Sequence, residues 1–205
     1  MTSDDAAPAS APDPVSAPAP VSAPAPASAP AAAGADAGAV PVVSDAAVPA
    51  ASDAAVRSFW AEARAARPEL PADPPEAWAF GATPEHADGL LALVLDGTKT
   101  ATASSLADYD EPDSEPVPVV GLLSVILDGA GAPRAVLEVT GVDVVPFDEV
   151  TAEHAHAEGE GDRSLAAWRE IHERFWRDYS AAGFAPDMPV VCERFSVVHP
   201  ARPES

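Results

Sequence analysis

The chain has 205 residues, with 33 acidic against 11 basic side chains and a formal net charge of −22 at pH 7. This excess of negative charge argues against broad, non-specific binding of nucleic acid, which needs a dense basic surface, although it leaves room for a small recognition cleft. The single cysteine excludes an intramolecular disulfide, and no run of about twenty apolar residues is present to span a membrane. Because the sequence shows no secretory signal, we expect a cytoplasmic protein.

Residues 1–52 differ in composition from the rest of the chain. They are almost wholly Ala, Pro, Ser, Val, Gly and Asp, contain no aromatic or basic residue, and repeat the hexapeptide VSAPAP at 15–20 and 21–26. Such a segment buries too little apolar surface to offset the entropy of ordering it. We therefore predict a disordered tail over 1–52, one domain over 53–200 and a short C-terminal tail over 201–205.

Two helices are predicted at the start of the domain from their caps and apolar spacing. The first would have a Ser or Asp cap at Ser52 and would end before Pro68. The second would be capped by Thr83, carry Pro84 in its first turn and stop at Gly97. The residues expected to face the core from these helices are Val56, Phe59, Trp60, Ala63, Leu90, Leu91, Val94 and Leu95.

The second half of the domain mixes predicted strands with predicted helices. Two runs rich in Val, Ile and Leu, 119–129 and 133–145, meet around the hairpin sequence DGAGAP, and 188–198 has the pattern of a closing strand. A short helix followed by a glycine-containing loop is expected within 146–162, and a long helix with a glycine stop over 164–183. This order predicts an α+β domain with a small curled sheet flanked by helices.

Lys99, just past the expected stop of the second helix, is the only lysine in the chain, whereas arginine occurs ten times. A solvated cation near a helix end would interact favourably with the helix dipole, but arginine would serve equally well there. Lysine differs because it can lose its proton when partly desolvated, and so can act as a base, a nucleophile or a point-charge anchor. The structural and the functional reading of Lys99 both stay open.

Three threonines alternate around this lysine, at Thr98, Thr100 and Thr102. In an extended segment they would share one face and Lys99 the other, so a turn starting at Gly97 is needed to bring Lys99 and Thr102 together. A threonine hydroxyl beside an amine can form a nucleophile and base pair. The structural alternative is threonine of high β-propensity in an edge strand.

A second polar cluster is AEGEGDRS, residues 157–164. Its two carboxylates, Glu158 and Glu160, are separated by glycine and could face a cleft, while Asp162 or Ser164 caps the following helix. A solvated glycine loop followed by a helix cap explains the same residues.

His154 and His156 raise the question of a metal site. On a helix the two side chains diverge, and no Cys follows at a ligand spacing. We therefore predict no metal ion and no cofactor, and we expect Cys192 to pack in the core.

Taken together and in this order, five segments of the domain resemble the bacterial ASCH-domain proteins of the PUA-like superfamily. The segments are WAFG, TPEHADGLLALVLDGTKTATAS, VGLLSVILDGAGAPRAVLEVTGVDVVPFDEV, AEGEGDRSLAAWR and VCERFSVV. The resemblance covers nearly all of 53–198. It implies a small PUA-like β-barrel flanked by helices, with a cleft between barrel and helices that accepts RNA or a nucleoside.

The resemblance also implies a set of working residues. In the short ASCH amidohydrolases that remove the acetyl group from N4-acetylcytidine, these are the lysine and threonine of a GxKxxT segment and the glutamate of an AxxE segment. Lys99 and Thr102 match the first and Glu158 the second, with Glu160 as the alternative because EGEGDRS is longer than the loop of the short enzymes. In that reading Lys99 assists attack by Thr102 or water on the acetyl carbonyl, and Glu158 shuttles the proton.

Two further functions stay open, each with a nucleoside or short single-stranded RNA as the partner. In a non-catalytic RNA-binding module Lys99 would contact a phosphate, assisted by Arg163 or Arg194, and an aromatic ring would stack on a base. In a ribonuclease, Ser164, Lys99 and an acid would share the general acid and base work. The rings that could stack are those of Trp78, Phe80 and Trp168.

Overall fold

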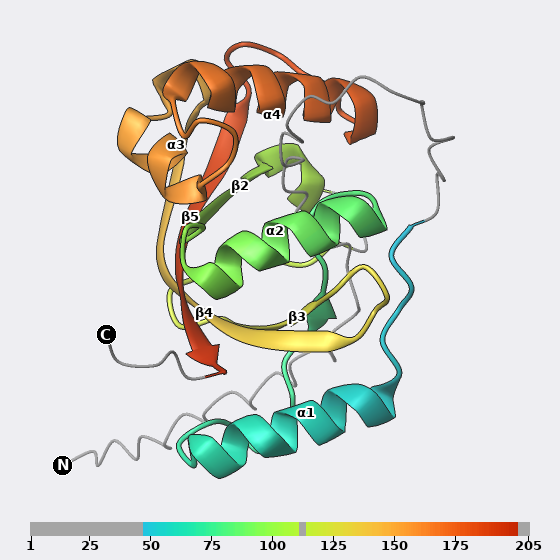
Figure 1. The fold of residues 1–205 in the computed structure, drawn as a ribbon. Helices are drawn as coiled ribbons and strands as arrows, with labels where there is room; N and C mark the ends of the chain where they lie inside the picture. Colours follow the sequence, from blue (N-terminus) through green and yellow to red (C-terminus); the bar gives the residue numbers. More distant parts are fainter. Residues whose placement is uncertain (1–46, 111–113, 201–205) are drawn as a thin grey trace, which may run out of the picture.

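The computed structural model describes residues 47–110 and 114–200 (Figure 1). Residues 1–46 of the predicted N-terminal tail and the whole predicted C-terminal tail lie outside the described residues. The last residues before the domain are described, and Ala51 among them packs, partly buried, against the core. The boundary between tail and domain therefore stays a prediction.

The predicted α+β class is confirmed, since helices flank a single sheet in the part of the chain that the structure describes. The helices are α1 (Asp53–Ala66), α2 (Pro84–Asp96), α3 (Ala152–Glu158) and α4 (Leu165–Tyr179). The strands are β1 (Ala77–Trp78), β2 (Ala101–Ser105), β3 (Leu123–Leu127), β4 (Pro133–Pro146) and β5 (Pro189–His199). Two short 3-10 turns are η1 (Leu106–Tyr109) and η2 (Phe147–Glu149).

The five-stranded sheet has the order β1-β3-β4-β5-β2. β1 pairs with β3 in parallel, and every other neighbouring pair is antiparallel. The register between β4 and β5 shifts twice, between Val136 and Leu137 and between Val139 and Gly141. Such irregularities bend a strand and increase its twist, as expected for a small curled sheet.

Three groups of apolar side chains hold the helices on the sheet, and Figure 1 shows α1 at one end of the molecule with α3 and α4 at the other. α1 packs against one set of side chains of β3 and β4, and α2 against the alternate set, as the period of two along a strand requires. α3 and α4 pack on β2 and β5. The site described below lies where α2, α3 and β2 meet.

The predicted caps of α2 are confirmed. The side chain of Thr83 accepts a hydrogen bond from the backbone N–H of His86 at 3.3 Å, and Gly97 ends the helix with φ 86°, a left-handed conformation that favours glycine. The predicted burial of Leu95 is wrong, because its side chain is 42% exposed. Leu95 lies in the last turn of α2, on the flank of the stripe made by the buried Leu90, Leu91 and Val94.

Two other element boundaries differ from the prediction. The residues 119–122 form a turn with exposed Val119 and Val120, and β3 begins only at Leu123. α4 stops at Tyr179, four residues before the predicted stop at Gly183, and has an extended cap at Ser180. Among the described residues, no helix is both long enough and apolar enough to cross a membrane.

Candidate functional site

The backbone around Lys99 is held between two helices. After the left-handed Gly97, the backbone N–H of Lys99 donates to the carbonyl of Leu93 at 2.9 Å, and the N–H of Thr100 donates to the carbonyl of Ala157 at 2.8 Å. The first bond ties Lys99 to the end of α2, and the second ties the next residue to α3. The predicted turn after Gly97 thus directs the lysine side chain into the interior.

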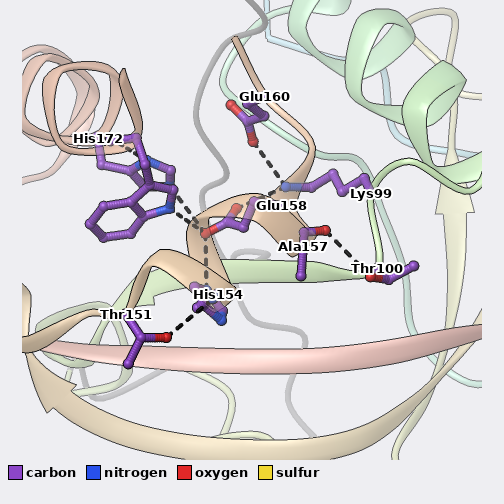
Figure 2. A network of polar contacts seen from close by, with 9 residues as sticks. Lys99, Thr100, Thr151, His154, Ala157, Glu158, Glu160 and His172 are labelled. Atoms are coloured by element: carbon purple, nitrogen blue, oxygen red, sulfur yellow. Dashed lines mark hydrogen bonds and ion pairs between the residues drawn. The ribbon is translucent and has the colours of Figure 1, made fainter. Parts of the chain in front are cut away.

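The amine of Lys99 lies between two carboxylates (Figure 2). Its Nζ is 2.9 Å from Oε2 of Glu158 and 2.9 Å from Oε1 of Glu160. The side chains of Lys99 and Glu158 are 0% exposed and that of Glu160 is 1% exposed. The structure therefore brings together three of the four predicted catalytic residues, and both glutamates contact the lysine. We call these three residues the ion cluster.

Gly159 explains how two glutamates so close in sequence reach the same amine. It ends α3 with φ 76°, and a Cβ placed on it would lie 2.8 Å from Cγ2 of Thr98 and 2.9 Å from the Thr98 carbonyl oxygen. Real Cβ atoms do not approach that closely, so any side chain here would push the loop away from the segment that carries Lys99. The glycine between the two carboxylates is required by this close approach.

Glu158 has the larger set of partners. Besides Lys99, Trp168 donates its Nε1–H to Oε1 at 2.7 Å, and the rings of His154 and His172 lie with Nε2 at 3.1 Å and 3.5 Å from the same oxygen (Figure 2). This number of contacts satisfies a buried carboxylate on both oxygens.

These contacts decide the charges of the ion cluster. Burial alone would lower the pKa of Lys99, but attraction by the two carboxylates outweighs it and raises that pKa. Burial likewise opposes ionisation of Glu158, but attraction by Lys99 and then by His172, together with the contact from His154, sets its pKa well below the usual value. For Glu160 burial wins, and its pKa is raised despite Lys99. The ion cluster thus contains a protonated Lys99, an ionised Glu158 and a Glu160 carboxyl that takes up a proton more readily than usual.

Glu160 also keeps one free oxygen. Its Oε2 is buried and has no hydrogen-bond partner among the described residues, whereas Oε1 is bound to Lys99. An unpaired buried acceptor is costly and calls for an explanation. Of the two glutamates, Glu160 is the one with capacity left for a further partner.

Thr102 lies in β2, opposite Glu193 of β5 in the antiparallel register, and is 2% exposed. Its neighbour Ala103 packs in the core under α3 and α4, so Thr102 projects to the other side of the sheet. Directly opposite residues of an antiparallel pair point to the same face. Thr102 and Glu193 therefore share a face of the sheet.

A cavity of about 540 Å³ opens on that face. Three of the described residues that line it are glutamates, none is lysine or arginine, and the others are mainly prolines and apolar or aromatic side chains. The lining residues with polar or aromatic side chains are Glu76, Trp78, Tyr109, Glu115, Ser124 and Glu193.

Two aromatic rings, Trp78 and Phe80, connect the cavity wall to the ion cluster. The ring of Trp78, at the cavity wall, packs edge-on against Phe80 with centroids 4.7 Å apart. On Phe80 in turn lies the ammonium of Lys99, with Nζ 5.7 Å from the ring centroid. Trp78 is half-buried at the cavity wall, and its stacking on a base stays a prediction.

The other two predicted stacking rings offer no free face. Phe80 is 0% exposed and lies among core side chains, and Trp168 is 2% exposed, stacks on His172 and binds Glu158. Stacking of a base on either ring is incompatible with this packing.

The remaining predicted binding residues have partners elsewhere. Arg163 donates to the carbonyl of His156 at 3.0 Å, and Arg194 pairs with Asp143 at 3.5 Å. Ser164 caps α4, accepting from the N–H of Ala167 at 3.1 Å. None of the three lines the cavity.

The histidines that raised the metal question take different roles. His154 joins the network around Glu158, whereas His156 is exposed and contacts Arg163. Within the described residues, no group of three or more His, Cys, Asp or Glu is arranged to hold a metal ion.

The sequence reasoning missed His172 and Glu193. His172 lies one turn after Trp168 on the buried side of α4, and at that spacing the pattern predicts a core residue. Glu193 was detectable, because in VVCERF it alternates with Val191 and Phe195, which puts a carboxylate on a buried face.

Comparisons with known proteins identify the family. A family model described as the ASCH domain matches residues 76–199. The chain is similar to the crystal structure of a protein from Enterococcus faecalis V583, of the family DUF984, with 36% identity, a TM-score of 0.63 and coverage of 70% of this chain and 88% of the other. It is also similar to the high-resolution crystal structure of an ASCH domain from Lactobacillus crispatus JV V101, with 30% identity, a TM-score of 0.64 and coverage of 71% and 95%.

No curated protein matches the chain. The domain match extends over β1 to β5 and includes the ion cluster and every lining residue of the cavity except Pro74 and Pro75. It supports the general class of an RNA-binding or hydrolase-like domain. With more than half of its length matched, the chain belongs to the ASCH-domain family.

Proposed function

We propose that this ASCH domain is a hydrolase that removes the acetyl group of N4-acetylcytidine, with Lys99, Thr102 and Glu160 at the reaction centre. The observation that carries the proposal is the ion cluster: the only lysine of the chain is fully enclosed between two carboxylates, and one of these keeps an unpaired oxygen. A surface-stabilising lysine would not be desolvated in this way, because burial of a charge is costly.

The contacts favour Glu160 over Glu158 as the proton carrier. Both oxygens of Glu158 are engaged, and its low pKa makes it a weak base. Glu160 has the raised pKa and the free oxygen that a general base needs. Glu158 then serves to hold the ammonium and the surrounding rings in place.

In the proposed reaction, the Thr102 hydroxyl or a water molecule attacks the acetyl carbonyl carbon, and its proton passes to the carboxylate of Glu160. The ammonium of Lys99 stabilises the negative charge that develops on the carbonyl oxygen. When the C–N4 bond breaks, Glu160 returns the proton to N4, and cytidine leaves as the amine. If Thr102 attacked, water then hydrolyses its acetyl ester and releases acetate.

The cavity supplies the substrate site in this proposal. Because Lys99 is 0% exposed and Phe80 lies between it and the cavity wall, the rings of Phe80 and Trp78 must move aside when the substrate binds. A nucleoside suits this cavity better than RNA, since both arginines expected to assist with phosphate are bound elsewhere.

The test is incubation of the full chain with N4-acetylcytidine, followed by chromatography of cytidine and assay of acetate. We expect turnover by the wild type and a loss of about 100-fold or more in Glu160→Gln at an unchanged melting temperature. Lys99→Arg should also lose turnover, since a guanidinium does not reproduce the compact ammonium. Glu170→Gln, an exposed change on α4, is the matched control. A folded wild type without turnover, or a fully active Glu160→Gln, would overturn the proposal.

A further inference from the structure

Glu193 is a buried carboxyl that neither the family motifs nor the proposed reaction uses. Its residue is only 5% exposed, yet it lines the cavity, and its Oε1 has no hydrogen-bond partner among the described residues. The two neighbours of Glu193 on β5 have partners elsewhere. Cys192 packs in the core under α4, and Arg194 pairs with Asp143. Glu193 is thus aimed into the cavity with hydrogen-bonding capacity left over.

The side chains around Glu193 do not stabilise a buried carboxylate, so a structural role does not explain why this residue is a glutamate. No lysine or arginine of the described chain lies with it on the cavity wall, and the charge that shifts its pKa is that of another carboxylate, Glu158. Burial first, and then repulsion by Glu158, raises the pKa of Glu193 to about 7. Near neutral pH the side chain is therefore present in both its protonated and its ionised form.

A protonated carboxyl has a distinctive recognition property. Its O–H donates while its carbonyl oxygen accepts, so it can bind a pair of adjacent groups of which one accepts and one donates. The edge of cytosine carries such a pair in N3 and N4–H, and an N4-acetylated cytosine keeps both.

The rest of the cavity suits a flat ring. Trp78 and Tyr109 line it as half-buried aromatic side chains, and the Tyr109 hydroxyl is held by Ser104 at 2.8 Å. Aromatic rings at a binding site offer stacking faces to any base. A volume of about 540 Å³ is within the ordinary range for a small-molecule site.

We propose that Glu193 is the specificity-determining residue of this cavity, binding the donor-acceptor edge of a neutral nucleobase, and that the cavity takes a nucleoside without phosphate. The inference rests on the proposed function, because it assigns the cavity as the substrate site of the ion cluster. Phosphate is disfavoured since Glu76, Glu115 and Glu193 line the cavity and the whole chain carries −22.

The test is equilibrium binding of cytidine and of cytidine 5′-monophosphate to the full chain by titration calorimetry. We expect wild type to bind cytidine, and to bind the monophosphate at least tenfold more weakly. Glu193→Leu should weaken cytidine at least tenfold. Glu193→Gln should stay within threefold of wild type, because an amide also donates and accepts side by side. Glu170→Gln, on the exposed side of α4, is the control for a lost carboxylate.

Each outcome decides the inference separately from the proposed hydrolase activity. No cytidine binding by folded wild type, undiminished binding in Glu193→Leu, or a monophosphate bound as tightly as cytidine would overturn the role of Glu193 and the cavity. Binding that follows the expected order without any hydrolysis of N4-acetylcytidine would support the recognition site while overturning the proposed reaction. Hydrolysis of N4-acetylcytidine with an unchanged KM in Glu193→Leu would support the proposed reaction while overturning the role of Glu193 in recognition.

Discussion

Two buried glutamates of this domain show opposite electrostatic behaviour. Glu158 is enclosed with Lys99, Trp168 and two histidines, and its pKa is well below the usual value although burial opposes ionisation. Glu193 is similarly buried at the cavity wall but lacks a cationic partner there, and its pKa is raised to about 7. The difference teaches that burial alone does not decide the charge of a carboxyl; its partners do.

The same contrast separates two kinds of contribution to the domain. The partners of Glu158 hold α3, α4 and the Lys99 segment together across long stretches of sequence. Among the described residues no cation is paired with Glu193, and its raised pKa means that its ionised form works against folding. Residues kept at a cost to stability are often kept for function.

The largest effect is expected from removing the cation of the ion cluster. Lys99→Met leaves Glu158 and Glu160 buried beside one another without compensation, and should lower the free energy of unfolding by about 3–5 kcal/mol. Urea denaturation measures this loss. The control is the triple variant with Glu158→Gln and Glu160→Gln added, which should recover most of it. A single Lys99→Met variant as stable as wild type would refute the electrostatic account of the cluster.

The next effect concerns Glu193 and pH. Its pKa rises from 4.5 to about 7 on folding, so the folded state binds the proton more tightly than the unfolded state. The free energy of unfolding should therefore fall as pH rises from about 4.5 to 7, by roughly 3 kcal/mol for this group, and level off above. The Glu76 and Glu160 carboxyls, whose pKa values are also raised, contribute in the same direction in every variant.

Glu193→Gln isolates this group, since it should be more stable than wild type at pH 8 and closer to it at pH 5. Denaturant unfolding at both pH values gives the difference. Parallel pH profiles for the two proteins would show that Glu193 is not the buried, poorly ionising group described here.

A smaller effect tests the hydrogen bond that Trp168 donates to Glu158. Trp168→Phe removes the 2.7 Å hydrogen bond to the charged Glu158 carboxylate. Trp176→Phe is the matched control on the same helix. Trp176 is also buried, and its Nε1 has no hydrogen-bond partner among the described residues. We expect Trp168→Phe to cost about 1–3 kcal/mol more than Trp176→Phe in unfolding experiments. Equal losses would mean that only packing is affected.

The smallest effect is expected from removing the helix cap at Ser164, which lies next to the ion cluster but outside it. Ser164 caps α4 just after the loop that carries Glu160, so Ser164→Ala should cost about 1 kcal/mol, and Ser164→Asp should restore most of it. Thermal melting of both variants measures this. A loss of N4-acetylcytidine turnover in Ser164→Asp at wild-type stability would instead place Ser164 in the chemistry.

Local features of the fold were readable from the sequence because they depend on neighbouring residues. The Thr83 cap and the Gly97 stop of α2 are where the pattern predicted them, and of the two caps left open for α4, Asp162 and Ser164, the structure uses Ser164. The misplaced residues lie at the margins of elements: Leu95 in the last turn of a helix and Val119 before a strand, where burial depends on what packs nearby.

The candidate site was predictable only in part. The lone lysine, the glycine between Glu158 and Glu160 and the family motifs pointed to the residues of the ion cluster. They left open which glutamate meets Lys99, and the structure shows that both do. His172 and Glu193 were missed because each has the local pattern of a core or strand residue.

What the sequence by itself determined is the class of the fold, the caps at both ends of α2 and the presence of a single lysine among many acids. Only the tertiary structure decided the partners of that lysine, which lie 59 and 61 residues further along the chain, and the placement of Glu193 at a cavity. The physical reason is that capping and chain stops arise from contacts within a few residues, whereas charge pairing and pKa depend on which distant side chains the packed sheet and helices bring into one low-dielectric interior.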